Sequence, residues 1–193
     1  GEISVSINES VRGGDIFLVQ PICAPHINDN LMELLIMADA AQRASASRIN
    51  AVIPYYGYAR QDRKSQAREP ITAKLVADLL SNVGMDRVIT MDLHASQIQG
   101  FFDIPVDHLY GLNTFADYIQ SLHLPNLIVA SPDEGGSKRA AKLATRLQTP
   151  MVMCYKNRAK ANEIAEMRVL GDVKDKNVVI IDDIADTVGT LSK

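Results

Sequence analysis

The fold is decided near the end of the chain by the stretch Val178-Val179-Ile180-Ile181-Asp182-Asp183-Ile184-Ala185-Asp186-Thr187-Val188-Gly189-Thr190. Four consecutive apolar residues are typical of a strand that is buried on both faces of a parallel sheet. Two acids follow the strand, and a short turn rich in Asp, Thr and Gly comes next. Ligands bind at the carboxyl ends of such strands, and the N–H groups of a following helix favour an anion. The stretch therefore predicts either a sugar and phosphate site or an ordinary solvated turn with a helix N-cap.

The rest of the chain alternates between short apolar runs and segments with helical spacing. Strands are predicted at residues 15–20, 50–54, 87–93, 127–130, 151–154, 165–170 and 177–181, and helices at 29–43, 71–80 and 137–147. This alternation predicts an α/β fold with mainly parallel sheets flanked by helices. We also expect an alternating strand over residues 2–7, a helix N-cap at Asn28 and a mobile polar loop over residues 157–163.

A break near residues 107–113 indicates two α/β units, an N-terminal one over 1–108 and a C-terminal one over 109–193. A chain of 193 residues is long enough for one large domain or two small ones. The chain starts on a strand pattern and stops where a helix should begin. We therefore expect the sequence to be incomplete at both ends.

Composition counts against several classes of protein. The net charge is −3, whereas general nucleic-acid binders are usually basic. No apolar run approaches the roughly 18 residues that a membrane-spanning helix needs. Cys23 and Cys154 lie in apolar stretches outside any C-x-x-C pair, which indicates reduced core thiols in a reducing cytosol. We expect a cytoplasmic protein that binds neither nucleic acid nor membrane.

Further side chains with functional chemistry follow other predicted strands. They lie in Tyr55-Tyr56-Gly57-Tyr58-Ala59-Arg60-Gln61-Asp62-Arg63-Lys64, Met91-Asp92-Leu93-His94-Ala95-Ser96-Gln97, Ser131-Pro132-Asp133-Glu134-Gly135-Gly136 and Met151-Val152-Met153-Cys154-Tyr155-Lys156-Asn157-Arg158. Arginine is well suited to phosphate contact, but an arbitrary basic run is more often a solvated loop. A lone histidine after a strand is likewise more often structural than a ligand. Taken alone, Lys156 and Arg158 are most simply solvated charges.

Together, these segments and the C-terminal stretch resemble the ribose-phosphate diphosphokinases (phosphoribosyl diphosphate synthetases) of the phosphate-activated class. The resemblance covers essentially the whole chain, and family members extend beyond both of its ends. It implies two phosphoribosyltransferase-like units and transfer of the diphosphoryl group of ATP to the 1-hydroxyl of ribose 5-phosphate. ATP and ribose 5-phosphate are then the small-molecule partners, Mg²⁺ is the cofactor, and the chain forms a homo-oligomer, commonly a hexamer.

The resemblance also implies a role for particular residues. ATP contacts carry over to Arg60 and Gln61, and to Gly1 and Glu2 at the end of an adenine-contacting element. Metal binding carries over to His94 and Asp133. Lys156 and Arg158 carry over as catalytic residues on a flexible loop. Ribose 5-phosphate binding carries over to Arg158, Asp182, Asp186, Thr187, Val188, Gly189 and Thr190.

Three other functions compete with this interpretation. A phosphoribosyltransferase that consumes phosphoribosyl diphosphate would share the C-terminal motif, but it has no need of the basic loop over residues 60–64. A non-catalytic regulatory subunit would keep the fold and lose catalytic residues, whereas Lys156, Arg158, His94 and Asp133 are all present. A nucleic-acid-binding module would rest on the basic loop alone and is disfavoured by the acidic balance.

Overall fold

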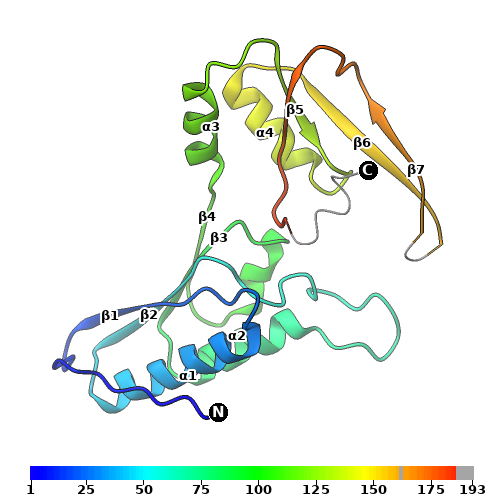
Figure 1. Ribbon diagram of the computed structural model, residues 1–193. Helices are drawn as coiled ribbons and strands as arrows, with labels where there is room; N and C mark the ends of the chain where they lie inside the picture. The colour runs from blue at the N-terminus through cyan, green and yellow to red at the C-terminus, as the bar shows by residue number, and fades with distance from the viewer. Residues whose placement is uncertain (161–162, 186–193) are drawn as a thin grey trace. The chain divides into compact units, whose positions relative to one another are not determined.

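The computed structural model describes residues 1–160 and 163–185, and the chain divides into two compact units, Gly1–Tyr110 and Gly111–Lys193 (Figure 1). Unit 1 contains β1 (Asp15–Val19), α1 (Ile27–Arg43), β2 (Arg48–Ile53), α2 (Thr72–Asn82), β3 (Arg87–Met91), the short 3-10 helix η1 (Ser96–Phe101) and β4 (Val106–Leu109). Unit 2 contains α3 (Leu112–Ser121), β5 (Leu127–Ser131), α4 (Ser137–Leu147), β6 (Met151–Lys160), β7 (Glu163–Leu170) and β8 (Asn177–Ile180).

Unit 1 is a parallel sheet in the order β1-β2-β3-β4, with α1 and α2 along one face (Figure 1). Because the strands follow one another across the sheet, right-handed crossovers place their connecting helices on the same side. Leu34 of α1 and Leu80 of α2 are fully buried in one core with Ile53 and Val88 of the sheet. Side chains of β1 on the other face stay exposed, since Phe17 is 59% accessible.

Unit 2 holds the second sheet, in the order β7-β6-β5-β8. β5 pairs in parallel with β6 and with β8, and only the β6–β7 pair is antiparallel among the described strands. Leu143 of α4 and Ile119 of α3 pack with Val129 and Ile181 in the core. The predicted α/β class with mainly parallel sheets is confirmed.

Three local predictions were wrong. Residues 2–7 form no strand, although Ile3, Val5 and Ile7 alternate in burial as a strand would, because no neighbouring strand pairs with them. α1 begins at Ile27 with His26 as its N-cap, so Asn28 lies inside the helix. Residues 157–160 continue β6 as a strand, because their backbone pairs with β7.

Among the helices of the part of the chain that the structure describes, none has the length and apolar character needed to cross a membrane. The longest is α1, with 17 residues. A spanning helix needs about 20 predominantly apolar residues.

Replacing Gly57 with Ala should destabilise unit 1. A Cβ atom at Gly57 would lie 2.5 Å from Cγ2 of Ile22 and 2.7 Å from its carbonyl oxygen, and Ile22 is fully buried. Forcing an extra carbon into a packed core costs about 1–3 kcal/mol. Gly100→Ala is the matched control, since nothing lies within 4 Å of a Cβ there. Urea unfolding should show a lower midpoint for Gly57→Ala than for Gly100→Ala, and equal midpoints would contradict the packing argument.

Candidate functional site

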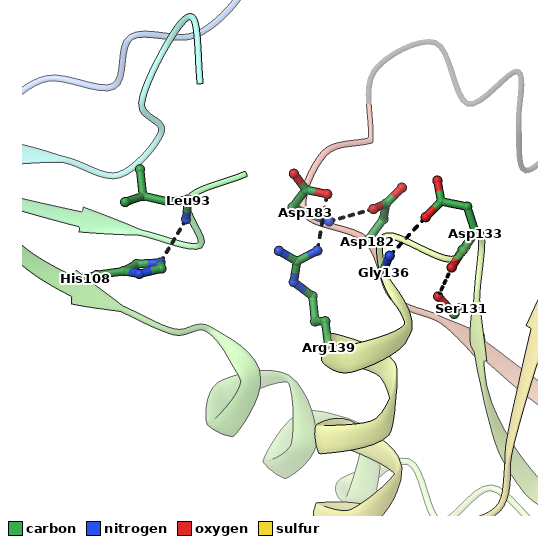
Figure 2. A network of polar contacts seen from close by, with 8 residues as sticks. All are labelled: Leu93, His108, Ser131, Asp133, Gly136, Arg139, Asp182 and Asp183. Carbon is green, nitrogen blue, oxygen red and sulfur yellow. Dashed lines mark hydrogen bonds and ion pairs between the residues drawn. The ribbon is translucent and has the colours of Figure 1, made fainter. Parts of the chain in front are cut away.

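The carboxyl ends of β5 and β8 lie next to each other in unit 2. The two strands are parallel neighbours with Ala130 opposite Ile180, and the N–H of Ile181 donates to the carbonyl of Ala130 at 3.2 Å. The loops that leave these strands, residues 132–136 and 181–185, therefore start side by side (Figure 2). Both loops carry carboxylates predicted to bind ligands.

The loop that carries Asp133 is held by two short-range hydrogen bonds (Figure 2). The fully buried hydroxyl of Ser131 donates to the carbonyl of Asp133 at 2.6 Å, and the N–H of Gly136 donates to Asp133 Oδ1 at 3.0 Å. A Cβ at Gly136 would lie 3.0 Å from the Ser131 hydroxyl, so this turn is tight. The carboxylate of Asp133 is therefore oriented before any ligand arrives, at the start of α4.

The acidic pair follows β8. The N–H of Asp183 donates to Asp182 Oδ1 at 2.9 Å, and Arg139 Nη1 of α4 donates to Asp183 Oδ1 at 3.2 Å (Figure 2). Partial burial, followed by the neighbouring carboxyls of Asp183 and Asp133, raises the pKa of Asp182 to about 6. Asp186, Thr187, Val188, Gly189 and Thr190 lie outside the described residues.

In unit 1, hydrogen bonds hold the segment that leads into the basic loop, residues 56–61, against the start of α2. The Tyr56 hydroxyl, which is buried, donates to the carbonyl of Ala73 at 2.9 Å. Gln61 accepts hydrogen bonds from the Thr72 hydroxyl at its side chain and from the Ala73 N–H at its carbonyl. Gln61 is thus held at the beginning of α2, while Arg60 beside it is exposed to solvent.

Residues 65–69, which follow the basic loop, form a turn around the carboxylate of Glu69. Glu69 accepts hydrogen bonds from the N–H groups of Ser65 and Gln66, at 2.8 and 2.9 Å. Arg63 and Lys64 remain exposed beside this turn. Gly1 and Glu2, the other residues predicted to meet ATP, are also exposed in unit 1.

The segment that carries His94 turns sharply as β3 ends. Asp92 has a left-handed backbone, with φ of 44°, and its N–H donates to the carbonyl of Leu109 at 3.0 Å. The next N–H, that of Leu93, donates to Nε2 of His108 at 3.0 Å (Figure 2). Leu93 is buried and His94 is exposed. Two contacts from β4 therefore set the direction in which His94 leaves the sheet.

Sequence reasoning missed His108, because the polar strand β4 was not predicted. Its signal lies in the register, in which Thr90 of β3 faces His108 of β4. That register lets the imidazole of His108 reach the N–H of Leu93, but it is visible only after the two strands are paired.

Replacing His108 with Ala should loosen the turn before His94. The Leu93 amide would lose its acceptor, and amide exchange there should speed up roughly 2- to 10-fold, as expected for one net hydrogen bond. His108→Gln is the matched control, because its side-chain oxygen can accept the same N–H. Hydrogen exchange at Leu93 measures both variants. The same exchange rate in the Ala and Gln variants would rule out this role for His108.

Lys156 and Arg158 lie on β6, where their backbones pair with Met167 and Ile164 of β7. Their side chains are outside the part of the chain that the structure describes. Their predicted catalytic role therefore remains a prediction.

The residues predicted to bind magnesium fit a water-rich site better than a protein cage. No group of three or more His, Cys, Asp or Glu side chains with metal-binding spacing occurs within residues 1–160 and 163–185. Of the two predicted ligands, His94 and Asp133, Asp133 supplies the oxygen ligand that Mg²⁺ prefers, and Mg²⁺ usually keeps several waters in its shell. The Asp133 carboxylate therefore fits an ion that completes its shell with water and phosphate oxygens.

Comparison with known protein families covers both units. The model of the N-terminal domain of ribose phosphate pyrophosphokinase matches residues 1–84, and the phosphoribosyl transferase domain matches residues 113–193. Ribose-phosphate pyrophosphokinases of Wolinella succinogenes and Porphyromonas gingivalis are 63% and 62% identical to the whole chain. The chain belongs to the ribose-phosphate pyrophosphokinase family. Pyrophosphokinase is another word for diphosphokinase, so the family that the sequence resembles is confirmed.

A solved ribose-phosphate pyrophosphokinase relative supports the fold of the described chain. The crystal structure of phosphoribosylpyrophosphate synthetase from Mycobacterium smegmatis superposes with a TM-score of 0.90 at 47% identity, over 99% of this chain and 62% of that one. The chain also spans 62% and 61% of the lengths of the Wolinella and Porphyromonas pyrophosphokinases. The similarity therefore concerns about three fifths of a family member.

Proposed function

We propose that the full-length protein transfers the β,γ-diphosphoryl group of ATP to the 1-hydroxyl of ribose 5-phosphate, which gives 5-phosphoribosyl 1-diphosphate and AMP. The observation that carries the proposal is the pairing of two loops in unit 2, where Asp133 and the Asp182–Asp183 pair leave adjacent parallel strands. The same chain carries an anchored basic loop in unit 1. Family membership supports both assignments.

In unit 2, we propose that Asp182 and Asp186 both contact the ribose, with Asp182 accepting hydrogen bonds from its hydroxyl groups. A carboxylate accepts hydrogen bonds from hydroxyl groups, and the exposed Asp182 is available to do so at the end of β8. The segment from Asp186 to Thr190 would bind the 5-phosphate through N–H and hydroxyl groups. In unit 1, Arg60, Gln61, Gly1 and Glu2 are assigned to ATP.

The reaction forms a bond between the ribose 1-oxygen and the β-phosphorus and breaks the bond from that phosphorus to the oxygen that leaves with AMP. The hydroxyl proton is lost, and negative charge spreads over the phosphoryl oxygens. Lys156 and Arg158 are assigned to that charge, because positioned cations are the main catalytic resource in such transfers. His94 of unit 1 and Asp133 of unit 2 are each assigned as a ligand of Mg²⁺, which would supply charge neutralisation to the bound phosphates.

The proposed function also suggests where the full-length protein is located and how it assembles. We assign it to the cytoplasm, where reduced Cys23 and Cys154 are expected, and both cysteines are free in the structure. A homo-oligomer, a hexamer by resemblance, is the expected assembly. We expect no nucleic-acid or membrane partner.

The test is AMP formation from ATP by the full-length protein, with and without ribose 5-phosphate and Mg²⁺, beside the 193-residue chain. AMP and phosphoribosyl diphosphate formed only with all components would support the proposal. Pyrophosphate release that depends on a nucleobase would favour a phosphoribosyltransferase instead. A well-folded full-length protein that forms no AMP would indicate a regulatory subunit, and mixing it with an active relative would then test that alternative.

A further inference from the structure

Arg139 occupies a position that helix stability alone does not explain. It lies in the first turn of α4, next to Lys138, and this turn contains no acid. The N-terminus of a helix carries a partial positive charge, so cations in the first turn are unfavourable there. A cation at an unfavourable position in a helix often has a role outside that helix, and Arg139 contacts Asp183 in the loop after β8.

The contact between Arg139 and Asp183 is more buried than a typical surface ion pair. Arg139 Nη1 lies 3.2 Å from Asp183 Oδ1, and the two side chains are only 23% and 12% accessible. A second pair on the same helix provides a comparison, because Arg146 Nη2 lies 3.3 Å from Asp117 Oδ1 with side chains that are 49% and 68% accessible. Solvent and salt screen the Arg146 pair strongly, and the Arg139 pair much less.

A continuous series of contacts runs from Arg139 to Asp182 (Figure 2). The guanidinium binds the Asp183 side chain, and the Asp183 N–H donates to Asp182 Oδ1 at 2.9 Å. We propose that Arg139 is a positioning residue of the ribose site, which holds Asp183 aside, fixes the Asp182 carboxylate toward the sugar, and offsets one of the three carboxylates at this edge. This inference rests on the proposed function, since it concerns how the same site receives ribose 5-phosphate.

Loss of the guanidinium should have two effects of opposite sign. The Asp183 carboxylate would lose the positive charge of Arg139 beside Asp182 and Asp133, and the fixed geometry of Asp182 would be lost. Ribose 5-phosphate, an anion, should then bind more weakly. A divalent cation without substrate should bind more tightly, because oxygen ligands and negative charge are what it prefers. A role for Arg139 in folding alone would weaken both kinds of binding.

The experiment compares Arg139→Gln, Arg139→Lys and the Arg139→Gln/Asp183→Asn double variant with an Arg146→Gln control, all in the full-length protein. Arg139→Gln should raise the KM for ribose 5-phosphate about tenfold, within the range of coupling between contacting charged groups, and leave the KM for ATP unchanged. Arg139→Lys should recover part of the loss, because the charge remains without the planar guanidinium. Arg146→Gln should change neither constant.

Binding of Mn²⁺ alone, followed by electron paramagnetic resonance, gives the readout that does not depend on activity. The Mn²⁺ affinity should rise severalfold in Arg139→Gln and return to the wild-type value in the double variant, which also lacks the negative charge of Asp183. Weaker Mn²⁺ binding in Arg139→Gln, or a KM for ribose 5-phosphate equal to that of the Arg146→Gln control, would overturn the inference.

Failure of the proposed function would be recognised separately. If the wild-type protein forms no AMP, hydrogen exchange at the Asp183 amide still decides the role of Arg139, because that N–H donates to Asp182 in the absence of substrate. Faster exchange in Arg139→Gln than in Arg146→Gln would support positioning of the acidic pair. Equal exchange in the two variants would overturn it.

Discussion

Replacing Lys156 with Ala in the full-length protein should lower turnover by about 10²–10³-fold and leave the affinity for ATP nearly unchanged. The reason is the timing of charge development. Negative charge on the transferring phosphoryl oxygens grows toward the transition state, so a cation aimed at that charge contributes most there and little in the ground state. The loss should therefore appear in kcat rather than in the KM for ATP.

The control for Lys156→Ala is Lys174→Ala, which removes the same charge from unit 2. Lys174 is exposed in the turn that leads into β8, at the end of the strand opposite the acidic pair. Steady-state kinetics and equilibrium ATP binding should be measured for both variants. If Lys156→Ala and Lys174→Ala lower turnover equally, Lys156 has no catalytic role. The same conclusion holds if Lys156→Ala lowers turnover and ATP affinity by the same factor.

The parts of the fold that sequence alone predicts are those that rest on local pattern. Residues 137–147 were predicted as a helix from their apolar spacing, and α4 has those bounds. The apolar run that ends at Ile181 predicts β8 and the place of the acidic pair after it. Both predictions depend on neighbours within one turn or one strand, which the sequence displays directly.

The parts that sequence missed depend on pairing between distant segments. β4 reads as polar, yet Arg87 of β3 holds Asp107 of β4 through two contacts of 2.9 Å, and their strands are adjacent. The extension of β6 beyond residue 156 depends on β7 as its partner. The Arg139–Asp183 pair joins residues 44 positions apart. Such contacts leave no periodic signal in the chain.

Replacing Asp182 with Asn in the full-length protein should lower kcat/KM for ribose 5-phosphate about 10- to 100-fold, as expected when a hydrogen bond to a charged acceptor is lost. The variant keeps the size of the side chain and removes its charge, so the KM for ATP should change little. Asp172→Asn is the control, because this exposed acid lies in the same unit before β8. An unchanged kcat/KM for ribose 5-phosphate in Asp182→Asn would exclude Asp182 from the ribose site.

The same variant tests the electrostatics of the acidic pair through the pH dependence of stability. Partial burial, together with the neighbouring carboxyls of Asp183 and Asp133, raises the pKa of Asp182 from 3.8 to about 6 in the folded chain. Below pH 3.8 the carboxyl is protonated in both the folded and unfolded states, and between 3.8 and about 6 only the unfolded state ionises readily, so rising pH destabilises the fold. Asp182→Asn lacks this loss, and its stability advantage over wild type should grow through that window and level off above it.

Urea unfolding of wild type and Asp182→Asn at several pH values measures this advantage, and other titrating groups cancel in the difference. The gain should be small, because Asp182 is exposed and solvent screens its neighbours. The raised pKa means that Asp182 holds its proton more tightly in the native state than in the unfolded state. A stability advantage of Asp182→Asn that shrinks as pH rises would instead mean that the pKa of Asp182 is lowered by folding. That outcome would mean that Arg139, rather than the neighbouring carboxyls and burial, dominates the field at Asp182.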